Sequence, residues 1–171
     1  LNTASFLRVQ TQFPIHQAEL VGLCALREAA GVTNPFEPAT RAQAHVMGDL
    51  CDKALCGGAA GVSLGPGYAP GTTLEEMETL CSCARAHGRP VSIDTRMYSM
   101  TDLHSLQEAI ELAEVTGCRM IVSHFVYQYG VGVEYEALEM LELARDRGVD
   151  MRLDSGMYKD WCSYIGSALF E

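Results

Sequence analysis

The stretch PVSIDTRMYSMTDLHSLQEAIELAEVTGCRMIVSHF, residues Pro90–Phe125, contains one strand–helix–strand unit. The apolar runs at its two ends, Pro90–Asp94 and Arg119–Ser123, are short and partly β-branched, which is typical of strands in a parallel sheet that is covered by helices. The segment between them has apolar residues at helical spacing and ends at Gly117, a residue that tolerates the left-handed stop of a helix. This stretch therefore predicts a βαβ crossover.

The same unit recurs along the chain. Three further short apolar runs are AELVGL (Ala18–Leu23), AAGVSL (Ala59–Leu64) and VDMRLD (Val149–Asp154). The connecting segments predict helices that open at Thr40, at Thr73 with Glu76 as a capping box, at Asp102 or Ser105, and near Tyr135. From the second run onward the strands start at 59, 90, 119 and 149, so each unit has about 30 residues. Short right-handed crossovers place consecutive strands side by side.

Two α/β architectures fit this pattern. One is a partial (β/α) TIM-type barrel of about five βα units. The other is an open, five-stranded, doubly wound parallel sheet. With 171 residues the chain is too short for a complete eight-stranded barrel, which typically needs about 250. No linker or low-complexity tract interrupts the pattern, so residues 1–171 are interpreted as a single α/β region without an internal domain boundary.

The composition excludes several classes of protein. Twelve basic against 22 acidic residues give a net charge of −10, which disfavours nucleic acid and anionic membranes as partners. No run of 18 apolar residues predicts a membrane span, and the first residues do not resemble a signal peptide, so we expect a cytoplasmic location. The seven cysteines are odd in number and lack metal-knuckle spacing, which favours reduced, small hydrophobic residues over a cysteine-rich metal site.

Candidate functional residues lie where strands end, because chemistry gathers at the carboxyl ends of the strands in both architectures. Asp94 and His124 are 30 residues apart, one repeat, so they are predicted to occupy equivalent positions on neighbouring strands. A carboxylate and an imidazole on adjacent strands suit Zn²⁺ or a similar divalent metal, with further ligands from elsewhere. The alternatives are a hydrogen-bonded strand-end histidine, and an aspartate that caps a helix or pairs with Arg96.

Two further side chains follow strands at the same edge. Arg96 could grip a substrate carboxylate or pair with Asp94 or Asp154. Tyr68, in the loop GPGYAPG, could donate a hydrogen bond to a carbonyl oxygen, although loop tyrosines often pack instead. The glycines of that loop indicate turns, since the chain has neither GxGxxG nor GK[ST] for a nucleotide.

Longer stretches resemble a known family. These are LVGLCALREA, PATRAQAHVMGDLCDKALCGGAAGVSLGPGYAPGTTLEEMETLC, HSLQEAIELAEVTGCRMIVSHF and RGVDMRLDSGMY. In order and spacing they are similar to the N-acyl-D-amino-acid deacylases (D-aminoacylases) of the amidohydrolase superfamily. The likeness spans roughly Ala18 to Tyr158. It implies a central fragment, strands three to seven, of a metal-dependent amidohydrolase barrel.

The resemblance implies a hydrolase of linear C–N amide bonds that deacylates N-acyl-D-amino acids and uses zinc, one or two divalent metals, to activate water. His124 matches the family's metal-binding histidine on the sixth strand, and Asp94 stands where the family has a histidine on the fifth. Arg96, Tyr68 and Tyr158 match segments implied to bind substrate.

The chain also departs from the family. The histidine pair of the first strand, the bridging cysteine of the second and the aspartate general base of the eighth have no counterpart in these 171 residues. No catalytic residue is therefore assigned, and this stretch by itself is predicted to be inactive. As a partial barrel it is expected to form a homo-oligomer or to pack against the remainder of a longer barrel.

Two alternatives stay open. One is a cyclic-amide hydrolase of the same superfamily, such as a dihydroorotase or hydantoinase, although AAGVSL lacks the lysine those enzymes usually carry. The other is a non-catalytic α/β binding or assembly domain.

Overall fold

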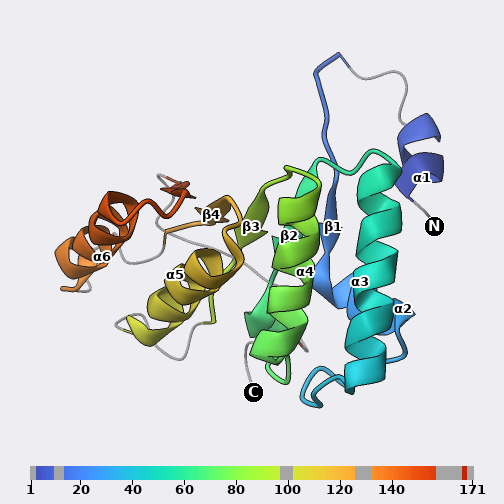
Figure 1. Cartoon of the computed structure of the whole chain (residues 1–171), viewed down its shortest axis with the longest axis horizontal. Coiled ribbons are helices and arrows are strands. Elements are labelled where there is room, and N and C mark those ends of the chain that lie inside the picture. Colours follow the sequence, from blue (N-terminus) through green and yellow to red (C-terminus); the bar gives the residue numbers. More distant parts are fainter. Residues whose placement is uncertain (1–2, 10–13, 97–101, 126–131, 157–166, 169–171) are drawn as a thin grey trace.

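Five short parallel strands form one sheet. In the computed structural model, residues 3–9, 14–96, 102–125, 132–156 and 167–168 are described. The strands are β1 (Leu20–Gly22), β2 (Gly61–Leu64), β3 (Val91–Ile93), β4 (Met120–Val122) and β5 (Met151–Leu153). Their spatial order is β1-β2-β3-β4-β5, and every pairing is parallel (Figure 1).

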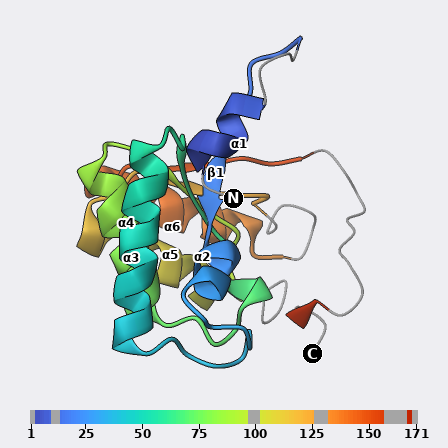
Figure 2. The same cartoon turned by 90° about the vertical axis from the view of Figure 1, so that its right-hand side faces the viewer.

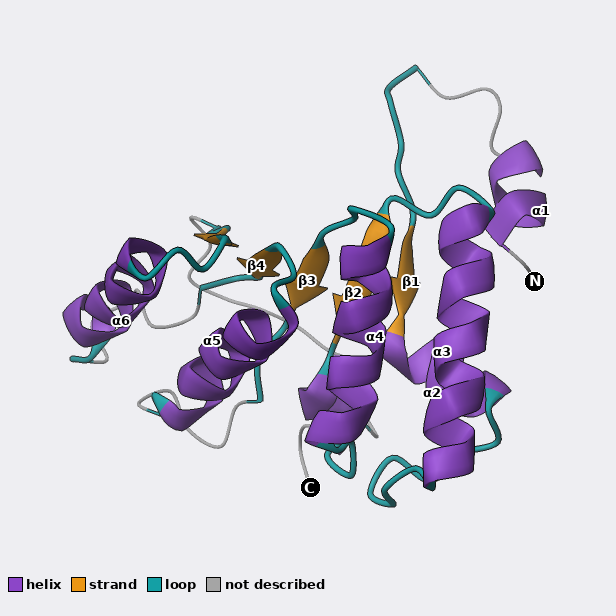
Figure 3. Ribbon diagram, in the orientation of Figure 1, coloured by secondary structure: helices purple, strands orange, loops and turns teal. Residues whose placement is uncertain are grey.

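Helices connect the strands. They are α1 (Thr3–Val9), α2 (Leu23–Ala29), α3 (Arg41–Cys56), α4 (Leu74–Ala86), α5 (His104–Thr116) and α6 (Glu134–Asp146), with a short 3-10 turn, η1 (Pro66–Tyr68). Figure 3 shows the alternation of helix and strand along the described chain. None of the helices in the described ranges is long and apolar enough to cross a membrane.

The helix starts follow from capping chemistry. Thr40 and Thr73 both form capping boxes, in which the threonine hydroxyl accepts from the backbone N–H three residues later. Asp102 Oδ1 accepts the His104 N–H at 2.9 Å, which satisfies an exposed donor at the start of α5. Gly117 ends α5 in the left-handed conformation, with φ +64°. The predicted helix starts at Thr40 and Thr73 are confirmed.

The strand order separates the two architectures that the sequence allowed. A doubly wound sheet reverses its strand order at a switch point and carries helices on both faces. Here the order never reverses, and α3, α4, α5 and α6 cover the same face of the sheet (Figures 1 and 2). Consecutive right-handed crossovers in one direction build the wall of a (β/α) barrel. The chain is therefore a partial barrel, and the doubly wound alternative is wrong.

The two faces of the sheet differ in polarity. Side chains that point toward the helices are fully buried and form the core, among them Val62, Val91 and Met120. Alternate positions point to the opposite face, where Ser63 lies beside Ser92 in the β2–β3 register. That face corresponds to the interior of a barrel, and Ser63, Ser92 and Ile121 on it are half-buried.

Candidate active site

The carboxyl ends of β3, β4 and β5 bring three chain segments together. Val91 pairs with Met120, so the next positions in register after the strands are Asp94, Ser123 and Asp154. His124 lies one residue further along than the position level with Asp94. The prediction that Asp94 and His124 are equivalent in register is therefore wrong by one residue. A one-residue slip normally turns a side chain to the opposite face of a sheet.

A turn at the end of β4 changes the direction of the backbone at His124. His124 has φ +51°, the single positive value among the non-glycine residues of the described ranges. Its N–H donates to Asp154 Oδ1 at 2.7 Å, and the Phe125 N–H donates to the Asp154 backbone carbonyl at 2.8 Å. Positive φ in a residue other than glycine costs free energy and is characteristic of functional sites. Asp154 therefore stabilises a backbone conformation that leaves the His124 side chain exposed.

Asp94 and His124 interact electrostatically at this edge. Burial raises the pKa of the Asp94 carboxyl, and the nearby His124 lowers it, so the two side chains are within range of each other. Below them, the hydroxyls of Ser92 and Ser123 lie 2.5 Å apart. A half-buried carboxylate beside an exposed imidazole is a donor pair that suits zinc. The pair supplies two ligands, and a zinc site needs further donors.

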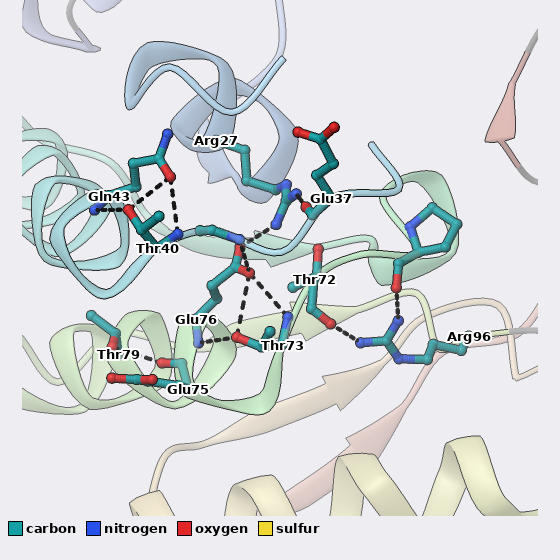
Figure 4. A network of polar contacts seen from close by, with 12 residues as sticks. Arg27, Glu37, Thr40, Gln43, Thr72, Thr73, Glu75, Glu76, Thr79 and Arg96 are labelled. Atoms are coloured by element: carbon teal, nitrogen blue, oxygen red, sulfur yellow. Dashed lines mark hydrogen bonds and ion pairs between the residues drawn. The ribbon is translucent and has the colours of Figure 1, made fainter. Parts of the chain in front are cut away.

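Arg96 is buried and bonded within the chain (Figure 4). Its Nε donates to both carboxylate oxygens of Glu108 on α5, at 3.2 and 3.0 Å. Its two terminal nitrogens donate to the backbone carbonyls of Pro70 and Thr72. Its ion-pair partner is thus Glu108, whereas the sequence suggested Asp94 or Asp154. Arg96 holds the loop between η1 and α4 against α5. That Arg96 binds a substrate carboxylate remains a prediction.

Tyr68 lies in η1, directly after β2, on the same edge of the sheet as Asp94. The side chain is half-buried, and its ring packs near Gly65, where an added Cβ would lie 3.3 Å from the ring. The other predicted substrate-binding tyrosine, Tyr158, lies outside the described residues.

A buried ion pair that the sequence did not reveal holds the other side of the same loop. Arg27 on α2 donates to Glu76 Oε2 and, at 2.5 Å, to the Glu37 backbone carbonyl (Figure 4). Glu76 Oε1 accepts the N–H groups of Ala39 and Thr73, each at 3.0 Å. The capping box at Thr73 was the sequence signal for Glu76, but nothing local pointed to Arg27, which is 49 residues away.

Thr72 offers a test of the packing in this loop. Its hydroxyl is buried and has no hydrogen-bond partner within the described ranges. Thr72→Val keeps the side-chain shape and removes that hydroxyl, so we expect the free energy of unfolding to rise by about 1 kcal/mol in urea titrations. Thr79→Val is the control, because the Thr79 hydroxyl donates to the Glu75 carbonyl at 2.7 Å and its loss should bring no gain. A loss of stability in Thr72→Val would contradict the interpretation of the Thr72 hydroxyl as a buried group without a hydrogen-bond partner.

Comparisons with known proteins point to one group of enzymes. No family model matches the chain. Among curated proteins, an N-acyl-D-glutamate deacylase of Alcaligenes xylosoxydans xylosoxydans is 31% identical over 154 residues, which is 87% of this chain and 31% of the relative. A D-aminoacylase of the same organism is 29% identical over 152 residues, covering 86% of this chain and 31% of that protein. The chain thus spans about a third of the length of these relatives.

Solved structures agree with this result. An N-acyl-D-glutamate deacylase from Bordetella bronchiseptica, in complex with zinc and a phosphonate inhibitor, matches with a TM-score of 0.80 and 27% identity. The match covers 92% of this chain and 34% of that one. A D-aminoacylase that defines a novel subset of amidohydrolases matches with a TM-score of 0.81 and 23% identity, again over 92% and 34%. Both support the partial barrel.

Proposed function

Because the chain is related over most of its length to the D-aminoacylases and other N-acyl-D-amino-acid deacylases of the amidohydrolase superfamily, we propose that it forms part of a metal-dependent hydrolase of linear C–N amide bonds. The proposed substrates are N-acyl-D-amino acids, and the proposed metal is zinc. The proposal concerns the part of the site that these 171 residues contribute.

One observation carries the proposal. Asp94 and His124 follow neighbouring strands of a barrel wall, and a positive-φ turn bonded to Asp154 fixes the histidine backbone beside the aspartate. Active sites of (β/α) barrels are built at this edge from residues of several strands. Asp94 and His124 would hold the ion, and zinc when bound would polarise the scissile carbonyl and lower the pKa of a water molecule.

The surrounding residues have positioning roles in this proposal. Asp154 orients His124 through the backbone bond, and no residue of this chain is assigned as the general base. Arg96 and the Arg27–Glu76 pair fix the two sides of the loop that follows Tyr68, a residue that we place at the border of the substrate site. Tyr158 is retained as a substrate-binding residue on the resemblance alone.

The metal assignment is tested by conservative variants. We expect His124→Asn and Asp94→Asn each to weaken zinc binding at least about tenfold, measured by equilibrium dialysis with inductively coupled plasma mass spectrometry. Asparagine tolerates positive φ, so His124→Asn preserves the turn. The matched controls are His45→Asn and Asp49→Asn on the exposed side of α3, which should bind zinc normally. Zinc affinity that is unchanged in both site variants would refute the assignment.

The substrate class is tested on a full-length enzyme that contains this stretch, by comparing the hydrolysis of N-acyl-D-amino acids, their L enantiomers and cyclic amides such as hydantoins. Turnover confined to the D enantiomers is expected of that enzyme, whereas the 171 residues alone should be inactive. The cyclic-amide alternative is disfavoured because β2, Gly61–Leu64, has no lysine to serve as a metal-bridging carbamate. Hydrolysis of the cyclic amides alone would replace the proposal by that alternative.

A further inference from the structure

We propose that the protein has another divalent-metal site, formed by Asp52 on α3, Cys83 on α4 and His87 directly after the end of α4, on the outer surface of the barrel wall. The site is separate from the Asp94–His124 pair and would take zinc or a cation of similar softness. Its role would be to join the two helices.

The ligand atoms already converge. One carboxylate oxygen of Asp52, the Cys83 sulfur and a His87 ring nitrogen all lie within 4.8 Å of one another. The His87 Nε2 and Asp52 Oδ1 atoms are 2.8 Å apart. Cys83 and His87 are four residues apart at the end of α4, which places them on one side of the helix, facing α3. A bound cation would take the place of the proton between Asp52 and His87, with a reorientation of the three side chains around it.

The mixture of donors selects the metal. A thiolate, an imidazole and a carboxylate are the three ligand types of protein zinc sites, whereas Mg²⁺ and Ca²⁺ prefer oxygen donors alone. Three protein ligands leave a fourth tetrahedral position for water. The Asp52 and His87 side chains are 58% and 26% exposed, so a cation can reach the site from solvent. Burial raises the pKa of the Cys83 thiol, so the metal would have to displace that proton.

The position in the fold favours a cation. Figure 1 shows α3 and α4 side by side with their carboxyl ends at the same level. Helix carboxyl ends carry partial negative charge, which stabilises a cation there. From the end of α4 the chain passes directly into the start of β3, so the site lies at the opposite edge of the sheet from Asp94 and His124. That edge of a (β/α) barrel serves stability.

This result changes one expectation from the sequence. The cysteines were expected to be reduced, small hydrophobic residues because their spacing along the chain does not form a metal knuckle. The structure keeps Cys81 in the core. Cys83 instead lies beside Asp52 on α3 and His87 at the end of α4. Because Asp52 is on another helix, spacing along the chain does not predict this cluster.

Cobalt substitution distinguishes this site from the Asp94–His124 pair. Co²⁺ bound to a thiolate gives a near-ultraviolet charge-transfer band, and neither Asp94 nor His124 can contribute one. We expect such a band when Co²⁺ is added to the metal-free protein under reducing conditions. It should be lost in Cys83→Ser and require at least about tenfold more Co²⁺ in His87→Gln. Cys24→Ser, which removes an exposed thiol on α2, and His124→Asn should retain it.

A thermal measurement provides the second readout. In a His124→Asn background, which disables the Asp94–His124 pair, zinc should still raise the midpoint of unfolding, and adding Cys83→Ser or His87→Gln should abolish that rise. His87→Gln should fold, because an exposed ion pair contributes little stability. The proposal is overturned if the parent protein gives no thiolate band, if Cys83→Ser keeps the band, or if Cys24→Ser abolishes it.

Discussion

Replacing Glu76 by alanine is expected to lower the free energy of unfolding by about 3–5 kcal/mol, because the substitution leaves the buried Arg27 guanidinium without its counter-charge. The Arg27 and Glu76 side chains are 2% and 0% exposed, so water cannot replace the lost partner. The change also removes the acceptor for the N–H groups of Ala39 and Thr73 and thus one half of the α4 capping box. The measurement is urea unfolding followed by circular dichroism.

The other capping box is a matched control. Thr40 and Gln43 make the same reciprocal bonds at the start of α3, but Thr40 is exposed and Gln43 does not contact a buried arginine. Gln43→Ala is expected to cost only about 1 kcal/mol. If Glu76→Ala does not fold, the double variant Arg27→Met, Glu76→Gln should, because it removes both charges and keeps a side-chain oxygen as acceptor. Equal losses of unfolding free energy in Glu76→Ala and Gln43→Ala would show that the buried Arg27–Glu76 pair adds no stability beyond that of the capping box.

Gly71→Ala is expected to destabilise the protein by about 3 kcal/mol, with a fall in melting temperature of about 2–4 °C for each kcal/mol. A Cβ at this position would lie 2.4 Å from the Phe36 carbonyl carbon, 2.5 Å from its oxygen and 2.7 Å from the Glu37 carbonyl carbon. All three are backbone atoms, which cannot rotate away. The Gly71 N–H also donates to the Pro35 carbonyl at 2.8 Å, so the two segments cannot separate without losing that bond.

Gly22→Ala is the control for the intrinsic effect of adding a methyl group. Gly22 has φ −91° and ψ 140°, which alanine adopts readily, and an added Cβ there meets no atom within 4 Å. Its effect is expected to stay within about 0.5 kcal/mol. If differential scanning calorimetry gives Gly71→Ala the same melting temperature as Gly22→Ala, the close approach of the two segments is not a constraint.

Local signals predicted the elements of the fold well. Threonine followed three residues later by glutamine or glutamate forms reciprocal bonds within one turn, so Thr40 and Thr73 could be identified as helix starts without tertiary information. The repeat of about 30 residues likewise predicted consecutive parallel strands. The sequence could not choose between a barrel and an open sheet, because that choice depends on the side to which each crossover returns.

Which face of each helix is buried was harder to predict. On α3, Val46 is 42% exposed, whereas Cys51 is fully buried. On α6, Leu138 is 40% exposed, whereas the smaller Ala137 is fully buried. Both helices have apolar residues on two adjacent faces. Hydrophobic spacing therefore predicts the helix, but not which of the two faces packs against the sheet. The close packing of helix on sheet then favours the smaller side chain.

The candidate site was predicted in outline, and its details depend on long-range geometry. The repeat correctly placed Asp94 and His124 after neighbouring strands, but β3 and β4 pair with an offset of 29 residues (Val91 with Met120), one fewer than separates Asp94 from His124. The turn held by Asp154 then redirects the backbone at His124, a feature that spacing along the chain does not predict. Arg96 was expected to face a substrate or an acidic residue of the site. Its actual partner, Glu108, is on the following helix and could not be distinguished by spacing from other acidic residues.

The strictly sequential strand order has a consequence for how the protein folds. β2, β3 and β4 each pair with the strands one unit before and one unit after them in the chain, and β1 and β5 pair with one neighbour. Within the described residues, the sheet therefore contains no pairing between distant units. The contact order is therefore low for a parallel sheet, and the entropic cost of loop closure is small and similar for each added unit. Such a chain can grow by adding one βα unit at a time to an existing edge, in the order in which a ribosome releases the units.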